Sequence, residues 1–177
     1  MIIELLRQRR SIRKFTDRPL SERQLKILEE AVLRAPSSRG RDPWQFIFVT
    51  DRDLLQALAT AKPHGAGFLA STAAAVILCA DPDCCDVWIE DCAIAAFILQ
   101  LTAQDLGLAS CWAQIRCREH DDHQDAESYV RHIAGIPENL RVDAIIGIGT
   151  ADEEKEGHGD ETLRRDRIHW QKYAGSK

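Results

Sequence analysis

The sequence predicts an α+β fold in which a central β-sheet is layered with helices. Short apolar runs of strand length alternate along the chain with segments whose apolar residues recur every three or four positions, the spacing of amphipathic helices. With 177 residues, of which 45% are hydrophobic, the chain is long enough for one globular domain that buries most of its apolar surface. We therefore expect a single domain over residues 1–177, although the pattern does not reveal the strand order.

Apolar runs bounded by turn residues predict the strands, at residues 44–50, 73–80, 108–115 and 142–150. The run AAAVILCA at 73–80 is apolar at every position, which is typical of a strand buried on both faces. Because several such runs occur, we expect these strands to share one sheet.

Helical spacing predicts the helices, at residues 1–7, 22–35, 51–61, 86–106, 124–134 and 163–173. Ser21 and Gln24 form a capping box before the second of these, and Pro36 stops it. The segment 86–106 is apolar nearly all round, so it is expected to be central or to lie in a subunit interface. The last segment is expected to pack on the body or on a partner through Ile168, Trp170 and Tyr173.

Composition excludes some classes of protein. The formal charge of −5 and a pI near 5.7 argue against a general nucleic-acid binder, which needs a basic surface to displace phosphate counterions. The N-terminus has neither a signal peptide nor an apolar run of membrane-spanning length. The six cysteines are scattered or adjacent rather than spaced as a disulfide framework, which indicates reduced thiols and a cytoplasmic location.

Residues 9–15, RRSIRKF, place three arginines within five positions just after a predicted helix. Each guanidinium presents a planar fork of donors that can grip phosphate oxygens, so the segment is a candidate anion site, with Ser11 adding a hydroxyl. The alternative is a solvated basic helix end that complements the helix dipole.

A second loop, PSSRGRDPW at residues 36–44, also follows a predicted helix directly. Gly40 allows a close approach of the backbone to a ligand, and the hydroxyls of Ser37 and Ser38 are further polar groups. On its own the loop would be an ordinary polar connection. Two such loops in an acidic protein favour a small anionic ligand, and the phosphate of a flavin is the leading candidate.

Together these segments resemble the FMN-dependent nitroreductase family over most of the chain. Residues 9–15 match the family signature RRSxRxF, and residues 35–46 match APSSxNxQPWxF. Gly40 stands where Asn is usual and Asp42 where Gln is usual, so the flavin contacts of those two side chains do not carry over. The later segments WIEDC, GLASCW and VDAIIGIG also resemble the central helix and strands of the family.

The resemblance implies a nitroreductase-like fold: a central mixed, mainly antiparallel sheet of four or five strands flanked by helices, in a domain-intertwined homodimer. FMN would lie in pockets at the subunit interface. Arg9 and Arg10 would meet its phosphate, and Ser11 the phosphate or ribityl chain. Arg13 would lie near the pyrimidine edge and favour the reduced flavin, which tunes its potential.

The resemblance also implies which other segments line the flavin. The loop residues that would line the phosphate and ring side, from the same subunit as the arginines, are Pro36, Ser37, Ser38 and Gly40. Those that would run along one side of the isoalloxazine are Cys111, Trp112, Ala113 and Gln114. Candidates to close over the phosphate from the C-terminal part are Lys155, Arg164 and Arg165. No catalytic nucleophile and no metal ion are expected, because the cofactor carries the chemistry.

The implied reaction is ping-pong transfer of hydride from NADH or NADPH to flavin N5, and then of electrons to a small-molecule acceptor such as a nitroaromatic or quinone. No GxGxxG follows a strand, so the reductant would bind without a Rossmann site. Alternatives are a specialised member that acts as a deiodinase or fragments the flavin, and a phosphate-binding domain without catalysis.

Three further groups of residues have types that could indicate a functional site. Cys117, His120 and His123 have the types of zinc ligands, but a polar loop before a helix is favoured over a metal site. Cys84 and Cys85 are favoured as free thiols over a redox pair, because adjacent cysteines bridge only with strain. His64 lies in a loop that the family places near the flavin, and a surface turn is equally consistent with the sequence.

Overall fold

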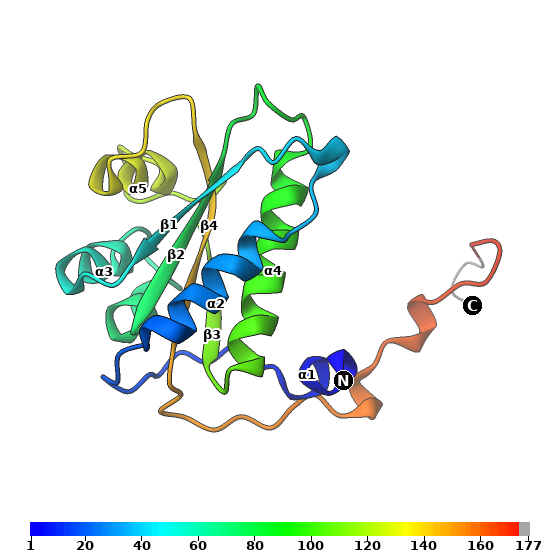
Figure 1. Ribbon diagram of the computed structural model, residues 1–177. Helices are drawn as coiled ribbons and strands as arrows, with labels where there is room; N and C mark the ends of the chain where they lie inside the picture. Colours follow the sequence, from blue (N-terminus) through cyan, green and yellow to red (C-terminus); the bar gives the residue numbers. More distant parts are fainter. Residues whose placement is uncertain (174–177) are drawn as a thin grey trace.

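The computed structural model describes residues 1–173 and contains a four-stranded sheet with the order β1-β2-β4-β3 (Figure 1). The strands are β1 (Trp44–Val49), β2 (Ala74–Ala80), β3 (Ala109–Gln114) and β4 (Arg141–Gly149). All three ladders are antiparallel, so the predicted mixed character is limited to one isolated parallel bridge between Ser11 and Ser110. The four predicted strands are confirmed.

Helices cover both faces of the sheet. They are α1 (Ile2–Gln8), α2 (Glu22–Leu33), α3 (Arg52–Ala59), α4 (Trp88–Asp105) and α5 (Ala126–Ala134), with short 3-10 turns η1 (Ser38–Gly40) and η2 (Gly67–Ser71). Figure 1 shows α2 and α4 on one face and α3 and α5 on the other. Each face has its own buried hydrophobic cluster. The capping box of Ser21 and Gln24 is present at the start of α2 as predicted.

The two central strands are buried along almost their whole length. Every residue of β2 is buried, and β4 is buried from Val142 to Gly149. An apolar run of this kind has no solvent face, which requires helices on both sides of the sheet. This explains why the strand at 73–80 could be predicted from its composition alone.

Helix α4 lies along the sheet and is the longest element of the fold. Its residues Cys92, Ala95, Ala96, Leu99 and Ala103 are buried, whereas Ile94 and Phe97 are about two-fifths exposed, at 43% and 42%. One side of the helix is therefore buried, and the other side exposes a small apolar stripe.

The predicted helix at 163–173 is wrong. Two 3-10 turns, η3 (Asp160–Thr162) and η4 (Arg165–Arg167), are the only regular structure in the described residues after β4. Residues from about 157 to 173 form an arm that leads away from the body (Figure 1). Trp170 is 80% exposed and Tyr173 78%; the Tyr173 ring contacts His169 within the arm, and neither side chain is buried against the body of the chain. Without a surface to cover, the apolar residues of so short a segment do not hold a helix.

Among residues 1–173, no helix combines the length and the apolar character needed to cross a membrane.

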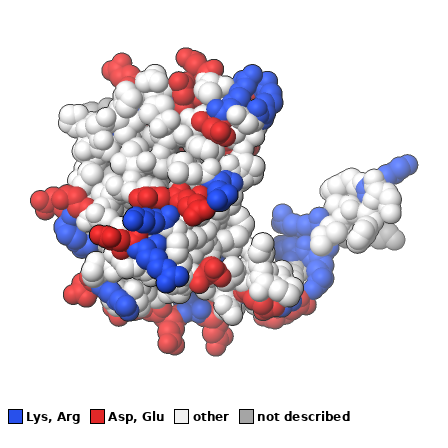
Figure 2. Space-filling view, viewed as in Figure 1, with Lys and Arg blue, Asp and Glu red and all other residues white. Residues whose placement is uncertain are grey.

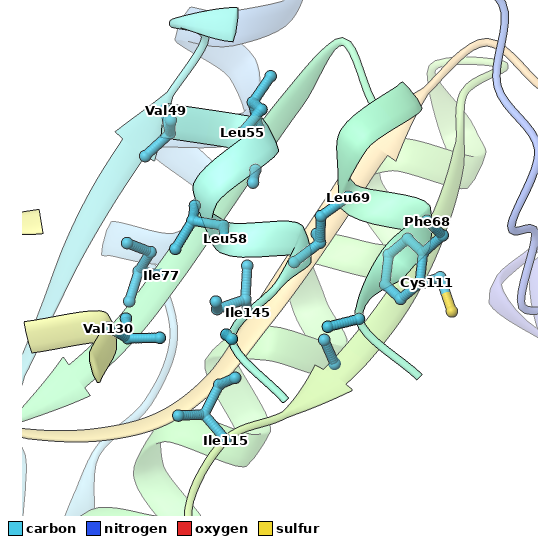
Figure 3. Packing of buried hydrophobic residues seen from close by; sticks show 14 of the residues in the cluster. Val49, Leu55, Leu58, Phe68, Leu69, Ile77, Cys111, Ile115, Val130 and Ile145 are labelled. Carbon is cyan, nitrogen blue, oxygen red and sulfur yellow. The ribbon is translucent and has the colours of Figure 1, made fainter. Parts of the chain in front are cut away.

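The core on the α3 side is packed closely against β4. Figure 3 shows Phe68 and Leu69 of η2 beside Cys111 of β3 and Ile145 of β4. A Cβ atom added at Gly147 would lie 2.7 Å from Thr72 Cγ2 and 2.8 Å from Phe68 Cε2. The absence of a side chain at Gly147 is thus what allows η2 to lie against the sheet.

We predict that Gly147→Ala lowers the free energy of unfolding by about 1 to 3 kcal/mol, because the added methyl group overpacks this contact. Gly67→Ala is the matched control, since a Cβ there would have no atom within 4 Å. Its effect should stay within about 0.5 kcal/mol. Urea unfolding of both variants measures the difference, and equal stability would contradict the packing described.

Candidate ligand-binding site

The arginine-rich segment at residues 9–15 is extended and lies between β3 and the chain that follows β4. Ser11 pairs with Ser110, Phe15 pairs with Ala151, and the Ile12 N–H donates to the Ser110 carbonyl at 3.2 Å. Ile12 and Phe15 are buried. Arg13 and Lys14, between these two buried residues, are exposed.

Two of the three arginines have guanidinium groups without a bonding partner in the described chain, and we call these groups uncommitted. Within residues 1–173, the side chains of Arg9 and Arg13 have no hydrogen bond and no ion pair. Arg10 donates to the backbone carbonyl of Glu156, which occupies part of its fork. Guanidinium groups without a carboxylate partner are available to an anion, so this segment fits a phosphate-bearing ligand.

Lys155 lies beside the same segment, whereas Arg164 and Arg165 do not. The Lys155 Nζ donates to the Ser11 carbonyl at 3.0 Å and to Glu153 Oε1 at 2.9 Å. Arg164 and Arg165 lie in the arm and pair with Asp166 and Asp160. Their predicted closure over a phosphate is therefore not formed within one chain.

The second loop, at residues 36–42, is held in an uncommon backbone conformation. Arg39, Gly40 and Asp42 have φ values of 56°, 61° and 48°. Ser37 Oγ donates to Asp42 Oδ1 at 2.5 Å and accepts from the Asp42 N–H at 2.9 Å. The Ser37 hydroxyl is thus engaged inside the loop, and the Asp that departs from the family pattern has a structural partner.

The connection between β2 and α4 clamps this loop from outside. Asp91, in the first turn of α4 and only 3% exposed, accepts the Ser38 N–H at 2.9 Å. Asp86 forms an exposed ion pair with Arg39 at 2.7 Å, and Arg41 donates to the Cys84 carbonyl at 3.1 Å. Sequence analysis missed Asp91, although an acid in the first turn of a predicted helix is a recognisable signal.

The two loops lie at opposite ends of α4. Ser38 contacts the first turn of the helix, whereas Arg10 lines a cavity of about 420 Å³ together with Gln104 and Gly107 at its last turn. At 1.5 Å per residue, the stretch of α4 from Asp91 to Gln104 spans about 20 Å. The structure therefore does not bring the two loops of a single chain together around one ligand, as the prediction that both line it from the same subunit would require.

The four predicted residues of β3 do not share one side of the sheet. Cys111 and Ala113 are buried in the cluster on the α3 and α5 face, whereas Trp112 packs on the α4 face. Trp112 Nε1 donates to Gln114 Oε1 at 3.0 Å, so these two form a pair. A period of two in a strand dictates this division, and at most one pair can face a ligand with its side chains.

Cations surround the buried thiol of Cys111. Burial raises its pKa, and the nearby charges of Arg13 and Lys155 act in the opposite direction. Burial also lowers the pKa of Lys62, and the neighbouring Arg118 adds to this effect. Lys62 was not among the predicted site residues. His64, two positions on, is exposed in the loop between α3 and η2.

The remaining sequence candidates have ordinary local surroundings. The His120 ring stacks on Tyr129 with centroids 3.9 Å apart, and its Nδ1 lies 3.2 Å from the Ala61 carbonyl. No group of three His, Cys, Asp or Glu side chains in the described part of the chain is arranged to hold a metal ion. Cys84 and Cys85 are free thiols, the first exposed and the second buried.

Comparisons with known proteins agree on one family. The model of the nitroreductase family matches residues 6–65. A protein of Archaeoglobus fulgidus with the provisional name NADH dehydrogenase/NAD(P)H nitroreductase is 33% identical over 176 residues, which is 97% of this chain and 98% of the relative. A protein of Methanothermobacter thermautotrophicus with the same provisional name is 31% identical and covers 97% and 87%.

A solved structure gives the same result. The FMN-dependent nitroreductase from Clostridium difficile R20291 superposes with a TM-score of 0.95 at 40% identity. The match covers 97% of this chain and 99% of the solved one. Similarity over nearly the whole of both chains includes both candidate loops and the start of β3.

We predict that Asp91→Ala destabilises the protein by about 1 to 3 kcal/mol, because it leaves the Ser38 N–H without its acceptor. Asp86→Ala is the control: it removes a carboxylate that grips the same loop from an exposed position, and should cost about 0 to 1 kcal/mol. Thermal or urea unfolding compares the two variants. A larger loss for Asp86→Ala would show that the exposed pair, and not Asp91, holds the loop.

Proposed function

Because the chain belongs to the nitroreductase family, we propose that it is a single-domain, FMN-dependent oxidoreductase that uses NADH or NADPH to reduce a small-molecule acceptor such as a nitroaromatic or a quinone. The observation that carries this proposal is the pair of uncommitted guanidinium groups at Arg9 and Arg13. Both lie on a segment fixed to the start of β3 by Ser11 and Ile12. When bound, FMN would accept hydride at N5 and pass electrons to the acceptor in a ping-pong cycle.

The residues of the chain bind and orient the cofactor. Arg9 binds the phosphate with its full fork of donors, and Arg10 contributes the donors that Glu156 leaves free. Arg13 extends from the same segment toward the pyrimidine edge of the ring and stabilises negative charge there on reduction. Ser11 contributes its hydroxyl, which also hydrogen-bonds the Cys111 thiol, while its carbonyl is bound by Lys155.

A second copy of the chain supplies the other half of each site. The separation of about 20 Å along α4, from Asp91 to Gln104, keeps Pro36, Ser38 and Gly40 of one chain away from its own arginines. A two-fold dimer packed through α4 places the loop of one copy near the arginines of the other. The exposed Ile94 and Phe97 support this use of the helix.

The C-terminal arm supports the same assembly. It carries four exposed apolar side chains, Leu163, Ile168, Trp170 and Tyr173. Strand β1 is an edge of the sheet, and beside it lies a cavity of about 520 Å³ lined by Leu33, Trp44 and Phe46 among others. The buried Trp44 Nε1 has no partner within the described chain. The arm of a second copy would cover this edge and bring its basic residues, visible in Figure 2, to the assembly.

We expect the protein, purified after addition of FMN and then unfolded, to release close to one FMN per chain. The absorbance of bound FMN should bleach when NADH or NADPH is added without oxygen, and return with a nitroaromatic or quinone. Flavin that stays bound and oxidised after NADH or NADPH is added would favour a phosphate-binding domain without catalysis. Loss of the flavin itself would favour the flavin-fragmenting alternative, and deiodination of a halogenated substrate the deiodinase-like one. Absence of bound flavin would refute the proposal.

The shared site predicts complementation between two defective chains. Arg9→Ala weakens phosphate binding in one chain, and Ser38→Tyr obstructs the loop in the other. Each homodimer then has two damaged sites, whereas the mixed dimer has one intact and one doubly damaged site. Differently tagged chains, co-expressed and purified through both tags, should regain about half of the wild-type FMN content. No recovery would mean that both loops act on the same chain's ligand.

A further inference from the structure

Glu153 lies four residues after the end of β4 and touches the arginine-rich segment directly. Its Oε1 accepts the backbone N–H of Arg13 at 2.5 Å and that of Lys14 at 3.2 Å. A carboxylate oxygen that accepts two successive N–H groups fixes the peptide between them in position and orientation.

Lys155 closes this arrangement into a ring of contacts. Its Nζ donates to the same Glu153 oxygen at 2.9 Å and to the Ser11 carbonyl at 3.0 Å. The segment from Ser11 to Lys14 is therefore held at both ends by two side chains that come from one short stretch after β4. The side chain of Glu153 is only 19% exposed, and that of Lys155 only 26%.

The charges around Glu153 keep it ionised. The Arg13 N–H and the Lys155 ammonium hold its pKa at about 2. Arg10, Glu154 and Glu156 line the same cavity as Glu153 and Lys155. Because the folded-state pKa is depressed from 4.5, the stability that Glu153 contributes is present above about pH 4.5 and is lost as the pH falls to about 2.

We infer that Glu153 is a positioning residue that sets the backbone at Arg13 and thereby aims the Arg13 guanidinium at the bound flavin. This inference rests on the proposed function, because it presumes FMN beside Arg13. Glu153 also carries a negative charge, and its two effects on the flavin have opposite signs. As a nearby charge it disfavours the reduced flavin, whereas as the residue that aims Arg13 it favours the reduced flavin.

The sign of the change in midpoint potential separates these effects. Glu153→Ala removes the acceptor oxygen, so we expect a lower midpoint potential for bound FMN, as in Arg13→Gln. Glu153→Gln keeps an acceptor oxygen but loses the charge, so its potential should lie above that of Glu153→Ala, at the wild-type value or slightly higher. The double variant Glu153→Ala/Arg13→Gln should not fall below Arg13→Gln alone, because the aimed group is already gone and only the loss of the Glu153 charge is added. Spectroelectrochemical titration measures all four.

Glu154→Ala is the matched control, since Glu154 lines the same cavity and makes no hydrogen bond in the described residues. It should leave the midpoint potential unchanged or raise it slightly. If Glu153→Ala and Glu153→Gln raised the midpoint potential equally, Glu153 would act on the flavin only as a nearby charge, and the inference would be overturned. An unchanged potential in Glu153→Ala would overturn it as well.

A measurement without flavin tests the positioning step independently. In the full chain free of FMN, amide hydrogen exchange at Arg13 and Lys14 should become about tenfold faster in Glu153→Ala. Exchange at Ile12 and Thr16 should not change, because their N–H groups donate to the Ser110 and Thr150 carbonyls. Unchanged exchange at Arg13 would refute the positioning role even if FMN binds. If exchange at Arg13 is faster in Glu153→Ala but the wild-type protein binds no FMN, the proposed function is refuted while the contact between Glu153 and the Arg13 backbone is supported.

Discussion

The burial of α4 against the sheet is the constraint on which the rest of the molecule depends. A helix that is apolar nearly all round cannot lie on a surface, and in this chain one side of it packs under α2 and on the sheet while Ile94 and Phe97 remain exposed. Its length also fixes the distance between the two polar loops, which are attached to its two ends. The packing of α4 thus determines where the two loops lie, and it is the reason why the proposed function includes a second chain.

Each half of the site is then shaped by a carboxylate that binds backbone N–H groups. Asp91 accepts the Ser38 N–H, and Glu153 accepts the Arg13 N–H. In the first of these loops the Asp42 carboxylate additionally accepts the Ser37 hydroxyl. Loops with positive φ values at two residues other than glycine are costly in isolation. Acceptors contributed by a helix or by the chain after a strand offset that cost, so the loops are fixed before any ligand arrives.

Much of the fold could be predicted from sequence because its signals are local. The apolar runs of β2 and β4, the capping box at Ser21 and the all-round apolar character of α4 each follow from residue type and spacing. The arm could not be predicted in the same way, since the apolar residues Ile168 and Trp170 have a helix-like spacing but no surface of their own chain to cover. The positions of the two loops depend on a strand order of 1-2-4-3, which no local pattern encodes. The alternation that separates Cys111 from Trp112 was readable, but the motif was treated as one unit.

The same carboxylates explain how a chain of net charge −5 can offer a site to an anion. A free carboxylate beside Arg9 or Arg13 would pair with the guanidinium and compete with a phosphate. Here Glu153 is committed to two N–H groups and to Lys155, and Asp91 to Ser38 and the Cys85 thiol. Their charge is therefore used to order the backbone, and the guanidinium groups of Arg9 and Arg13 remain the only uncommitted cations on the 9–13 segment, because Arg10 is partly bound by Glu156. On this segment, acidic composition and an anion site are compatible because Glu153 acts on the backbone and the guanidinium groups of Arg9 and Arg13 are left for a ligand.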